Sequence, residues 1–95
     1  MEYTETESLL LSIVGAITKK PEEIEIHTSE ETDEDGELFV INVKVAPEDA
    51  GVCIGQGGNT AEALRRIVGL FAFHKTGKRY FVRIDAPKMK KNFFY

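Results

Sequence analysis

The feature that most constrains this chain is a glycine turn, Gly-Gln-Gly-Gly at residues 55–58, placed between two segments with helical character. Gly55 and Gly58 stand three residues apart, which lets the backbone take positive φ angles and leaves no Cβ atoms in the way of an approaching ligand. Because Asn59 and Thr60 open the second helix, its first N–H groups and its positive dipole end point toward the same place. The turn is predicted to bind phosphate, and a nucleic-acid backbone is the natural ligand.

The segments around the turn give it a structural context. A strand-like run ends at Val45, and Pro47 then suits the first position of a short helix that leads into the turn. An amphipathic helix follows the turn, and Thr76-Gly77 is expected to end it. A final strand is predicted over Tyr80–Asp85, where apolar and polar residues alternate. The whole unit is a strand, a helix, the turn, a helix and a strand.

The chain carries a longer pattern around the turn, Val-Ala-Pro-Glu-Asp-Ala-Gly-Val-Cys-Ile-Gly-Gln-Gly-Gly-Asn-Thr-Ala at residues 45–61. This pattern resembles the KH family of RNA-binding domains, and more closely the small single-KH proteins of bacteria (KhpA-like), over residues 4–86. The resemblance implies an α+β type II KH fold with the order α-β-β-α-α-β, in which helices pack on one face of a three-stranded mixed sheet. One domain is expected over residues 1–87, comprising an N-terminal extension (4–28) and a βααβ core (38–86), with a tail at residues 88–95.

The resemblance also implies the site, because in KH domains such a turn clamps about four nucleotides of single-stranded RNA or DNA. The expected nucleic-acid-binding residues are Gly55, Gln56, Gly57 and Gly58 of the turn, their neighbours Ile54 and Asn59, and the cationic side chains Arg65, Arg66 and Lys44. The bases are expected to lie across an apolar groove lined by Val52, Ile54, Ala61 and Val40. KH turns usually carry a basic residue at a middle position, and here both are uncharged, which predicts weak affinity.

The charge of the chain is unevenly distributed. The net charge is −4, which by itself disfavours nucleic-acid binding. Residues 1–37 hold twelve acidic and two basic side chains, a charge of −10, whereas residues 38–95 hold ten basic and four acidic ones, a charge of +6. The turn lies in the basic half. This polarity favours placing a polyanion on one face, although an ordinary solvated surface would also account for it.

Local patterns predict the N-terminal elements. Thr4 and Glu7 have the spacing of a capping box, and apolar residues follow at helical spacing. The helix is expected to run to Lys20, with Lys19-Lys20 at its negative end and Pro21 stopping it. Alternation over residues 23–28 predicts a strand with two isoleucines, Ile24 and Ile26, facing inward.

Residues 29–37 are almost wholly polar and include Asp35-Gly36, so they are expected to form a solvated connection between two strands. A calcium loop is disfavoured, because the register that places Gly36 sixth puts Asn42 where the bidentate glutamate belongs. The next strand should direct its core face through Phe39, Ile41, Val43 and Val45. On the long helix, one core stripe is predicted over Ala61, Leu64, Ile67, Val68, Phe71 and Ala72.

No enzyme chemistry, cofactor or metal site is expected. The turn lacks the Gly-Lys-Ser/Thr of a Walker loop, and Thr60 stands where a dinucleotide loop needs its third glycine. The single cysteine, Cys53, is expected to be a small buried apolar residue, and the two histidines, His27 and His74, have no ligand spacing around them.

No run approaches the length of a membrane span and the N-terminus is not that of a signal peptide, so a cytoplasmic location is expected, with no membrane partner. The alternative to RNA binding is a KH-fold protein-interaction module that forms a homodimer, or a heterodimer with another KH protein, through its sheet or tail. The tail, residues 88–95, mixes three lysines with three aromatics, which suits base stacking or packing against the domain or a neighbour.

Overall fold

The computed structural model describes residues 3–85. Its main elements are α1 (Glu5–Ile17), β1 (Glu25–Asp33), β2 (Gly36–Lys44), α2 (Ala50–Ile54), α3 (Asn59–Thr76) and β3 (Tyr80–Asp85). Three short 3-10 helices, Pro21–Glu23, Pro47–Asp49 and Gln56–Gly58, stand at the joints. This order confirms the predicted α+β class and fits a type II KH fold. The tail at 88–95 and the end of the predicted domain at residue 87 lie outside the described residues.

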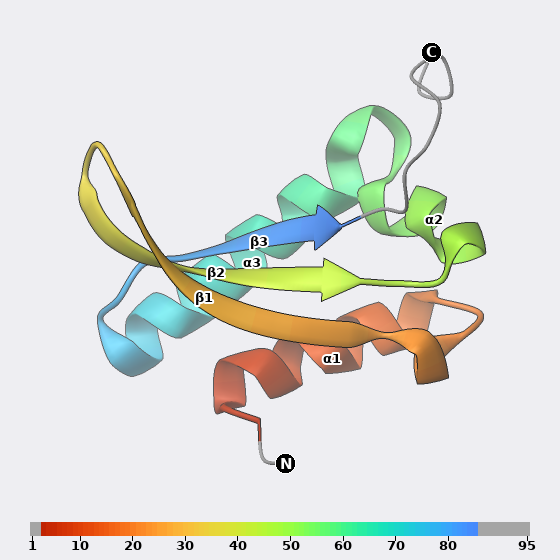
Figure 1. The fold of residues 1–95 in the computed structure, drawn as a ribbon, viewed down its shortest axis with the longest axis horizontal. Helices are drawn as coiled ribbons and strands as arrows, with labels where there is room; N and C mark the ends of the chain where they lie inside the picture. The colour runs from red at the N-terminus through yellow and green to blue at the C-terminus, as the bar shows by residue number, and fades with distance from the viewer. Residues whose placement is uncertain (1–2, 86–95) are drawn as a thin grey trace.

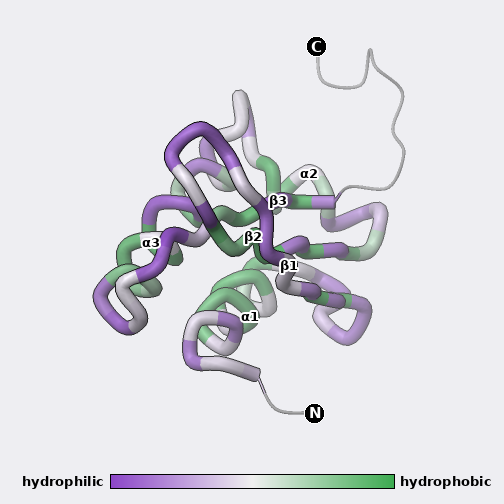
Figure 2. The backbone as a smooth tube through the Cα atoms, turned by 60° about the vertical axis from the view of Figure 1, so that its left-hand side comes forward, coloured by the Kyte–Doolittle hydropathy of each residue, from purple (hydrophilic) through white to green (hydrophobic). Residues whose placement is uncertain are grey.

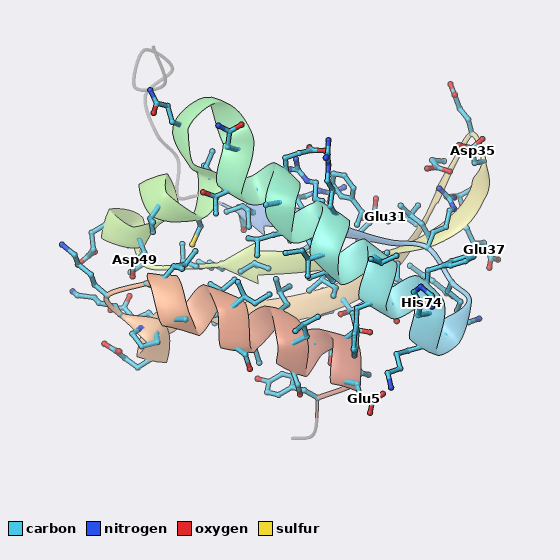
Figure 3. All side chains as sticks on the ribbon, turned by 180° about the vertical axis from the view of Figure 1, so that it is seen from behind. Glu5, Glu31, Asp35, Glu37, Asp49 and His74 are labelled. Carbon is cyan, nitrogen blue, oxygen red and sulfur yellow. The ribbon has the colours of Figure 1, made fainter. Side chains whose placement is uncertain are left out.

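The three strands form one mixed sheet in the order β1-β2-β3 (Figure 1). β1 pairs antiparallel with β2, and β2 pairs parallel with β3. The parallel pair requires a crossover, and α2, the glycine turn and α3 supply it. Seen from behind, α1 and α3 lie across one face of the sheet, as predicted (Figure 3).

The core lies between that sheet face and the helices. Its residues come from every layer and are each at most 2% exposed: Leu10, Val14, Ile41, Val43, Leu64, Val68 and Val82. The predicted core face of β2 is confirmed for Ile41, Val43 and Val45, whereas Phe39 is half-buried and stacks on Tyr80 with ring centroids 5.1 Å apart. Burial of these aliphatic side chains supplies most of the driving force for folding.

Helix α1 begins as predicted but ends early. Thr4 and Glu7 form the capping box. The helix stops at Ile17 rather than Lys20, so the prediction that Lys19-Lys20 complements its negative end is wrong. The reason is tertiary: the backbone N–H groups of Lys19 and Lys20 each donate to the buried carboxylate of Asp49 at 2.9 Å, which holds this segment out of the helix.

Most of residues 29–37 belong to two paired strands, which corrects the prediction of a solvated connection between strands. β1 runs to Asp33 and pairs with β2 from Gly36 onward, so the turn consists of residues 34–35. Figure 2 shows that this hairpin is hydrophilic at its tip. Backbone pairing does not need an apolar face, and long polar strands can persist when cross-strand contacts hold them.

Two arginines from the chain's C-terminal part provide those contacts. Arg79 Nη2 lies 2.7 Å from the carboxylate of Asp33 and also donates to the Gly36 carbonyl, and Arg83 Nη2 lies 3.3 Å from Glu31. Hydrogen bonding from Arg79 lowers the pKa of Asp33 below its usual value. At the base of β1, Ile24 and Ile26 pack against the core, as predicted.

Helix α3 has a narrower core stripe than the sequence predicts. Ala61, Leu64, Val68 and Ala72 are buried, but Ile67 is 50% exposed and Phe71 is half-buried. The assignment of Ile67 to the core is therefore wrong. Helix α3 packs diagonally over the sheet, and one i, i+4 row of small and branched residues fills the contact.

The two glycines of α3 have different roles. Gly69 lies against β3, and a Cβ atom there would meet the Tyr80 carbonyl oxygen at 3.5 Å, an ordinary contact. Gly77 ends the helix with φ 74°, and its N–H donates to the Phe73 carbonyl, which confirms the predicted left-handed cap.

Candidate nucleic-acid interface

The turn between α2 and α3 is made almost entirely of backbone with positive φ angles. Gly55, Gly57 and Gly58 have φ angles of 81°, 64° and 82°. Only glycine takes such angles at little cost, so the sequence of this turn follows from its geometry. A short 3-10 helix at Gln56–Gly58, which the sequence did not predict, leads into α3. The start of α3 at Asn59 agrees with the prediction.

Gly55 is required for a second reason. A Cβ atom at this position would lie 2.6 Å from the backbone nitrogen of Thr60 and 2.8 Å from its Cβ atom, closer than real Cβ contacts come. The first turn of α3 therefore packs directly on the Gly55 backbone. Gly57 and Gly58 have open space where a Cβ atom would point. The middle of the turn therefore faces outward, and Gln56 is the residue there that carries a side chain.

The amides of the turn divide into engaged and unengaged groups. The N–H of Gly55 donates to the Gly51 carbonyl at 2.8 Å, and the N–H of Gly58 donates to the Gly55 carbonyl at 3.1 Å. Within residues 3–85, the N–H groups of Gln56 and Gly57 donate to no acceptor, and both residues are exposed. Two adjacent donors are therefore available to an external anion.

The N-terminus of α3 adds to the field at this place. The helix spans eighteen residues, and its N-cap, Gly58, provides no side-chain cap. Its positive dipole end is thus left to the ligand rather than to a capping oxygen. Glu62, one turn into the helix, is the one acidic residue in its first turn. Bare amides at an uncapped helix start are a favourable setting for a phosphate oxygen.

The apolar surface beside the turn is smaller than expected. Val52 is 45% exposed and Ile54 is half-buried, so both are available to a ligand. Ala61 and Val40 are at most 5% exposed, and the prediction that they line an open groove is therefore wrong. Ala61 faces the core because it lies on the buried row of α3. Val40 points to the sheet face opposite that of the core residue Ile41, and it is buried on that face as well.

Two of the predicted cations follow the turn on α3. Arg65 Nη1 lies 3.7 Å from Glu62, and Arg66 Nε lies 3.4 Å from the same carboxylate. The Arg66 side chain is 78% exposed, whereas that of Arg65 is 33% exposed and reaches toward β3. The shared carboxylate offsets part of the positive charge, so the net local charge is modest.

The third predicted cation, Lys44, lies elsewhere. It is exposed at the end of β2, on the sheet face opposite the core residues Val43 and Val45. Its register partners are Glu25 on β1 and Asp85 on β3, and the three line a shallow hollow with Asn42 and His27. The structure does not bring Lys44 together with the turn, and its role in binding stays a prediction.

Acidic side chains of the β1–β2 hairpin lie at the opposite end of α3 from the turn. Asp35 and Glu37 extend from the hairpin, which lies near the C-terminal end of α3, whereas the turn precedes its N-terminal end (Figure 3). The charges of the two halves are not separated in space throughout, because Arg79 and Arg83 pair with Asp33 and Glu31 of β1. A polyanion is repelled from the hairpin and tolerated at the turn.

The remaining reactive groups are structural in character. Cys53 is fully buried in α2. Burial raises the pKa of its thiol, and the nearby negative charge of Asp49 raises it further. A protonated buried thiol is a poor nucleophile. In the part of the chain that the structure describes, no three histidine, cysteine or acidic side chains are grouped to hold a metal ion.

Sequence reasoning missed two features of α3. Ile67, Leu70 and Phe73 are 50%, 63% and 57% exposed, so a second, outward apolar surface runs along the helix. The signal was present, since apolar residues recur on more than one helix face. The second feature is a contact of Arg65 with Phe81 of β3, whose guanidinium carbon lies 4.6 Å from the ring centroid. No local pattern joins residues that far apart.

Comparison with known proteins gives the family. A family model described as "KhpA/KhpB, KH domain" matches residues 7–84. "RNA-binding protein KhpA" of Clostridium acetobutylicum is 37% identical over 76 residues, covering 80% of this chain and 95% of the relative. The protein of the same name from Clostridium perfringens is 36% identical over 72 residues, covering 76% of this chain and 89% of that protein.

Among solved structures, a variant of Aquifex aeolicus Era matches with a TM-score of 0.66 and 9% identity. The match covers 90% of this chain but 31% of the Era chain, so it concerns one part of that protein and shows the fold alone. None of the helices within residues 3–85 combines the length and apolar character that a membrane crossing requires.

Proposed function

This chain belongs to the KhpA/KhpB family of KH domains, and we propose that it is an RNA-binding protein that holds single-stranded RNA at the Gly55–Gly58 turn. Its relatives are named RNA-binding proteins, which supports RNA as the ligand class. Single-stranded DNA has the same phosphate backbone, and we propose it as a further ligand of the turn. The cytoplasmic location and the absence of catalysis stay predictions.

The observation that carries the proposal is the pair of unengaged amides at Gln56 and Gly57 on an uncapped helix start. A phosphate oxygen placed there accepts from one or both N–H groups and meets the positive end of the α3 dipole. The adjacent nucleotides then lie along α2 and α3, where Val52 and Ile54 offer apolar contact. Arg66, which is largely exposed, contributes charge to a neighbouring phosphate.

A salt titration tests this arrangement. With three or four phosphates neutralised, we expect the logarithm of RNA affinity to fall against the logarithm of salt concentration with a slope of about −2 to −3 for a single strand. Fluorescence anisotropy with a labelled eight-nucleotide RNA between 50 and about 500 mM salt measures that slope. The same RNA annealed to its complement is the matched control, and it should bind more weakly because the bases are no longer accessible. An RNA affinity that does not change with salt concentration, or equal binding of the duplex, would rule out the proposed site.

A second candidate function is self-association, and the outward apolar surface of α3 favours it. Ile67, Leu70 and Phe73 follow one another at three-residue spacing and are each at least half exposed. Apolar side chains gathered on one exposed helix face are typical of a protein contact. This surface differs from the sheet and tail that the sequence suggested, and it can meet a second copy of the chain or another KH domain.

Replacing Leu70 by aspartate should shift a dimer of this chain to monomer, because a carboxylate would be buried against an apolar partner without compensation. Sedimentation equilibrium measures the mass. Leu70 is 63% exposed, so thermal stability should change little. Thr32→Asp, which adds the same charge on the exposed hairpin, is the control. A parent protein that is monomeric at high concentration would rule out self-association through α3.

A further inference from the structure

Arg65 holds a fixed position between α3 and the edge of the sheet. Its Nε donates to the Val82 carbonyl at 2.9 Å, and its guanidinium carbon lies 4.6 Å from the centroid of the Phe81 ring. Glu62 Oε1, 3.7 Å from Nη1, adds a third contact. A planar guanidinium stacked on an aromatic ring and held by a hydrogen bond has little conformational freedom left to lose on binding.

The strand beneath this pair is the open edge of the sheet. β3 pairs with β2 and stands last in the strand order. The Arg79 carbonyl accepts from Phe39 of β2, and carbonyl directions alternate along a strand, so the Val82 carbonyl points away from β2. Arg65 therefore occupies the acceptor that an edge strand would otherwise offer to a ligand.

The pair is accessible and lies within reach of the turn. Phe81 is 36% exposed and the Arg65 side chain is 33% exposed, although both belong to elements that pack on the core. Arg65 is seven residues beyond Gly58 on α3, which corresponds to roughly 10 Å along the helix. Nη2 of Arg65 has no acceptor among residues 3–85, so one donor group stays available.

We propose that Arg65 and Phe81 together form a stacking platform for one nucleobase of the strand whose phosphate binds at the glycine turn. The proposal rests on the proposed function and adds a base contact to it. Bases of single-stranded RNA stack on aromatic rings and on arginine guanidinium planes. Stacking on a ring and a guanidinium plane is possible for every base, so the platform contributes affinity with little preference among bases.

The experiment compares an eight-nucleotide RNA with a series in which one position at a time lacks its base. In the parent protein, loss of the stacked base should lower affinity about tenfold at one position and much less elsewhere. In Phe81→Leu and Arg65→Lys, removing the base at that position should lower the affinity no more than removing a base elsewhere. Intact RNA should bind these variants about five- to tenfold more weakly than the parent. Arg83→Lys, on β3 and paired with Glu31 rather than with an aromatic ring, is the matched control and should keep the parental profile.

The outcomes separate this platform from the turn. If the parent binds RNA but shows the same flat profile as the two variants, the platform is refuted while binding at the turn stands. If Arg65→Lys melts at a lower temperature but retains the parental profile, Arg65 is a structural link between α3 and β3, and the platform is again refuted. A parent that binds no single-stranded RNA refutes both, and the salt titration identifies that failure independently. Phe81→Leu keeps the test decisive where Arg65→Lys folds poorly, because it leaves the bond to Val82 intact.

Discussion

Replacing Gln56 and Gly57 together by aspartate is expected to weaken RNA binding at least tenfold. The two carboxylates would stand beside the only unengaged amides of the turn, where the phosphate is proposed to bind. At roughly 4 to 6 Å, each repulsion costs about 1 kcal/mol or more in partly screened surroundings, and two such terms exceed a factor of ten. Anisotropy with the single-stranded RNA used for the salt titration measures the change.

The turn itself should tolerate this double substitution. Gln56 is exposed, and a Cβ atom at Gly57 meets nothing within 4 Å. Gly57 has φ 64°, a left-handed geometry that aspartate and asparagine accept better than other side chains. Gln56→Asn/Gly57→Asn is therefore a matched control, equal in shape and backbone strain but neutral. If the aspartate and asparagine proteins bind RNA equally well and melt together, the turn does not contact phosphate, and self-association through α3 becomes the better account.

Replacing Asp49 by alanine is expected to cause the largest loss of stability. Asp49 is 1% exposed, and its two carboxylate oxygens accept from the backbone N–H groups of Lys19 and Lys20, each at 2.9 Å. Hydrogen bonds to a charged group contribute about 1.5 to 3 kcal/mol each, so the free energy of unfolding should fall by about 3 kcal/mol. For a domain of this size, the melting temperature should drop by roughly 15 °C.

Two variants define the cause. Asp49→Asn keeps one acceptor oxygen in nearly the same volume and should fall between the parent and Asp49→Ala. The neighbouring Glu48 is the matched control, because its exposed carboxylate lies 2.8 Å from Lys20 Nζ and Glu48→Ala should barely move the melting temperature. Equal melting of Asp49→Ala and Glu48→Ala would show that the buried carboxylate does not hold the α1–β1 connection (Figure 3).

Asp49 lies within the motif at residues 45–61 and links two parts of the fold. Asp49 stands in the 3-10 helix before α2, and its side chain ties the end of α1 to the segment that leads into the turn. In the sequence, Asp49 is an acidic residue close to the start of a predicted helix, where a carboxylate is favourable. Its larger role depends on contacts with Lys19 and Lys20, thirty and twenty-nine positions earlier in the chain.

The candidate site divides in the same way. The positive φ angles, the start of α3 at Asn59 and the exposure of Gln56 follow from glycine chemistry and could be read locally. Which amides stay unengaged could not, because that depends on the hydrogen bonds of the whole turn. The position of Lys44 on the sheet face away from the core and the burial of Val40 depend on how the sheet packs against the helices.

The sequence by itself determined the order of the elements, the capping box of α1, the core face of β2 and the glycine turn, because each is set by contacts within about four residues or by the alternation of a single strand. The tertiary structure alone decided where α1 ends, how far the β1–β2 hairpin extends, which face of α3 stays exposed and where Arg65 lies. These depend on partners that are 17 to 52 residues apart in the chain, such as Arg65 with Val82 and Arg83 with Glu31. A hydrogen bond between such residues exists only once the helices have packed on the sheet, so no local pattern can record it.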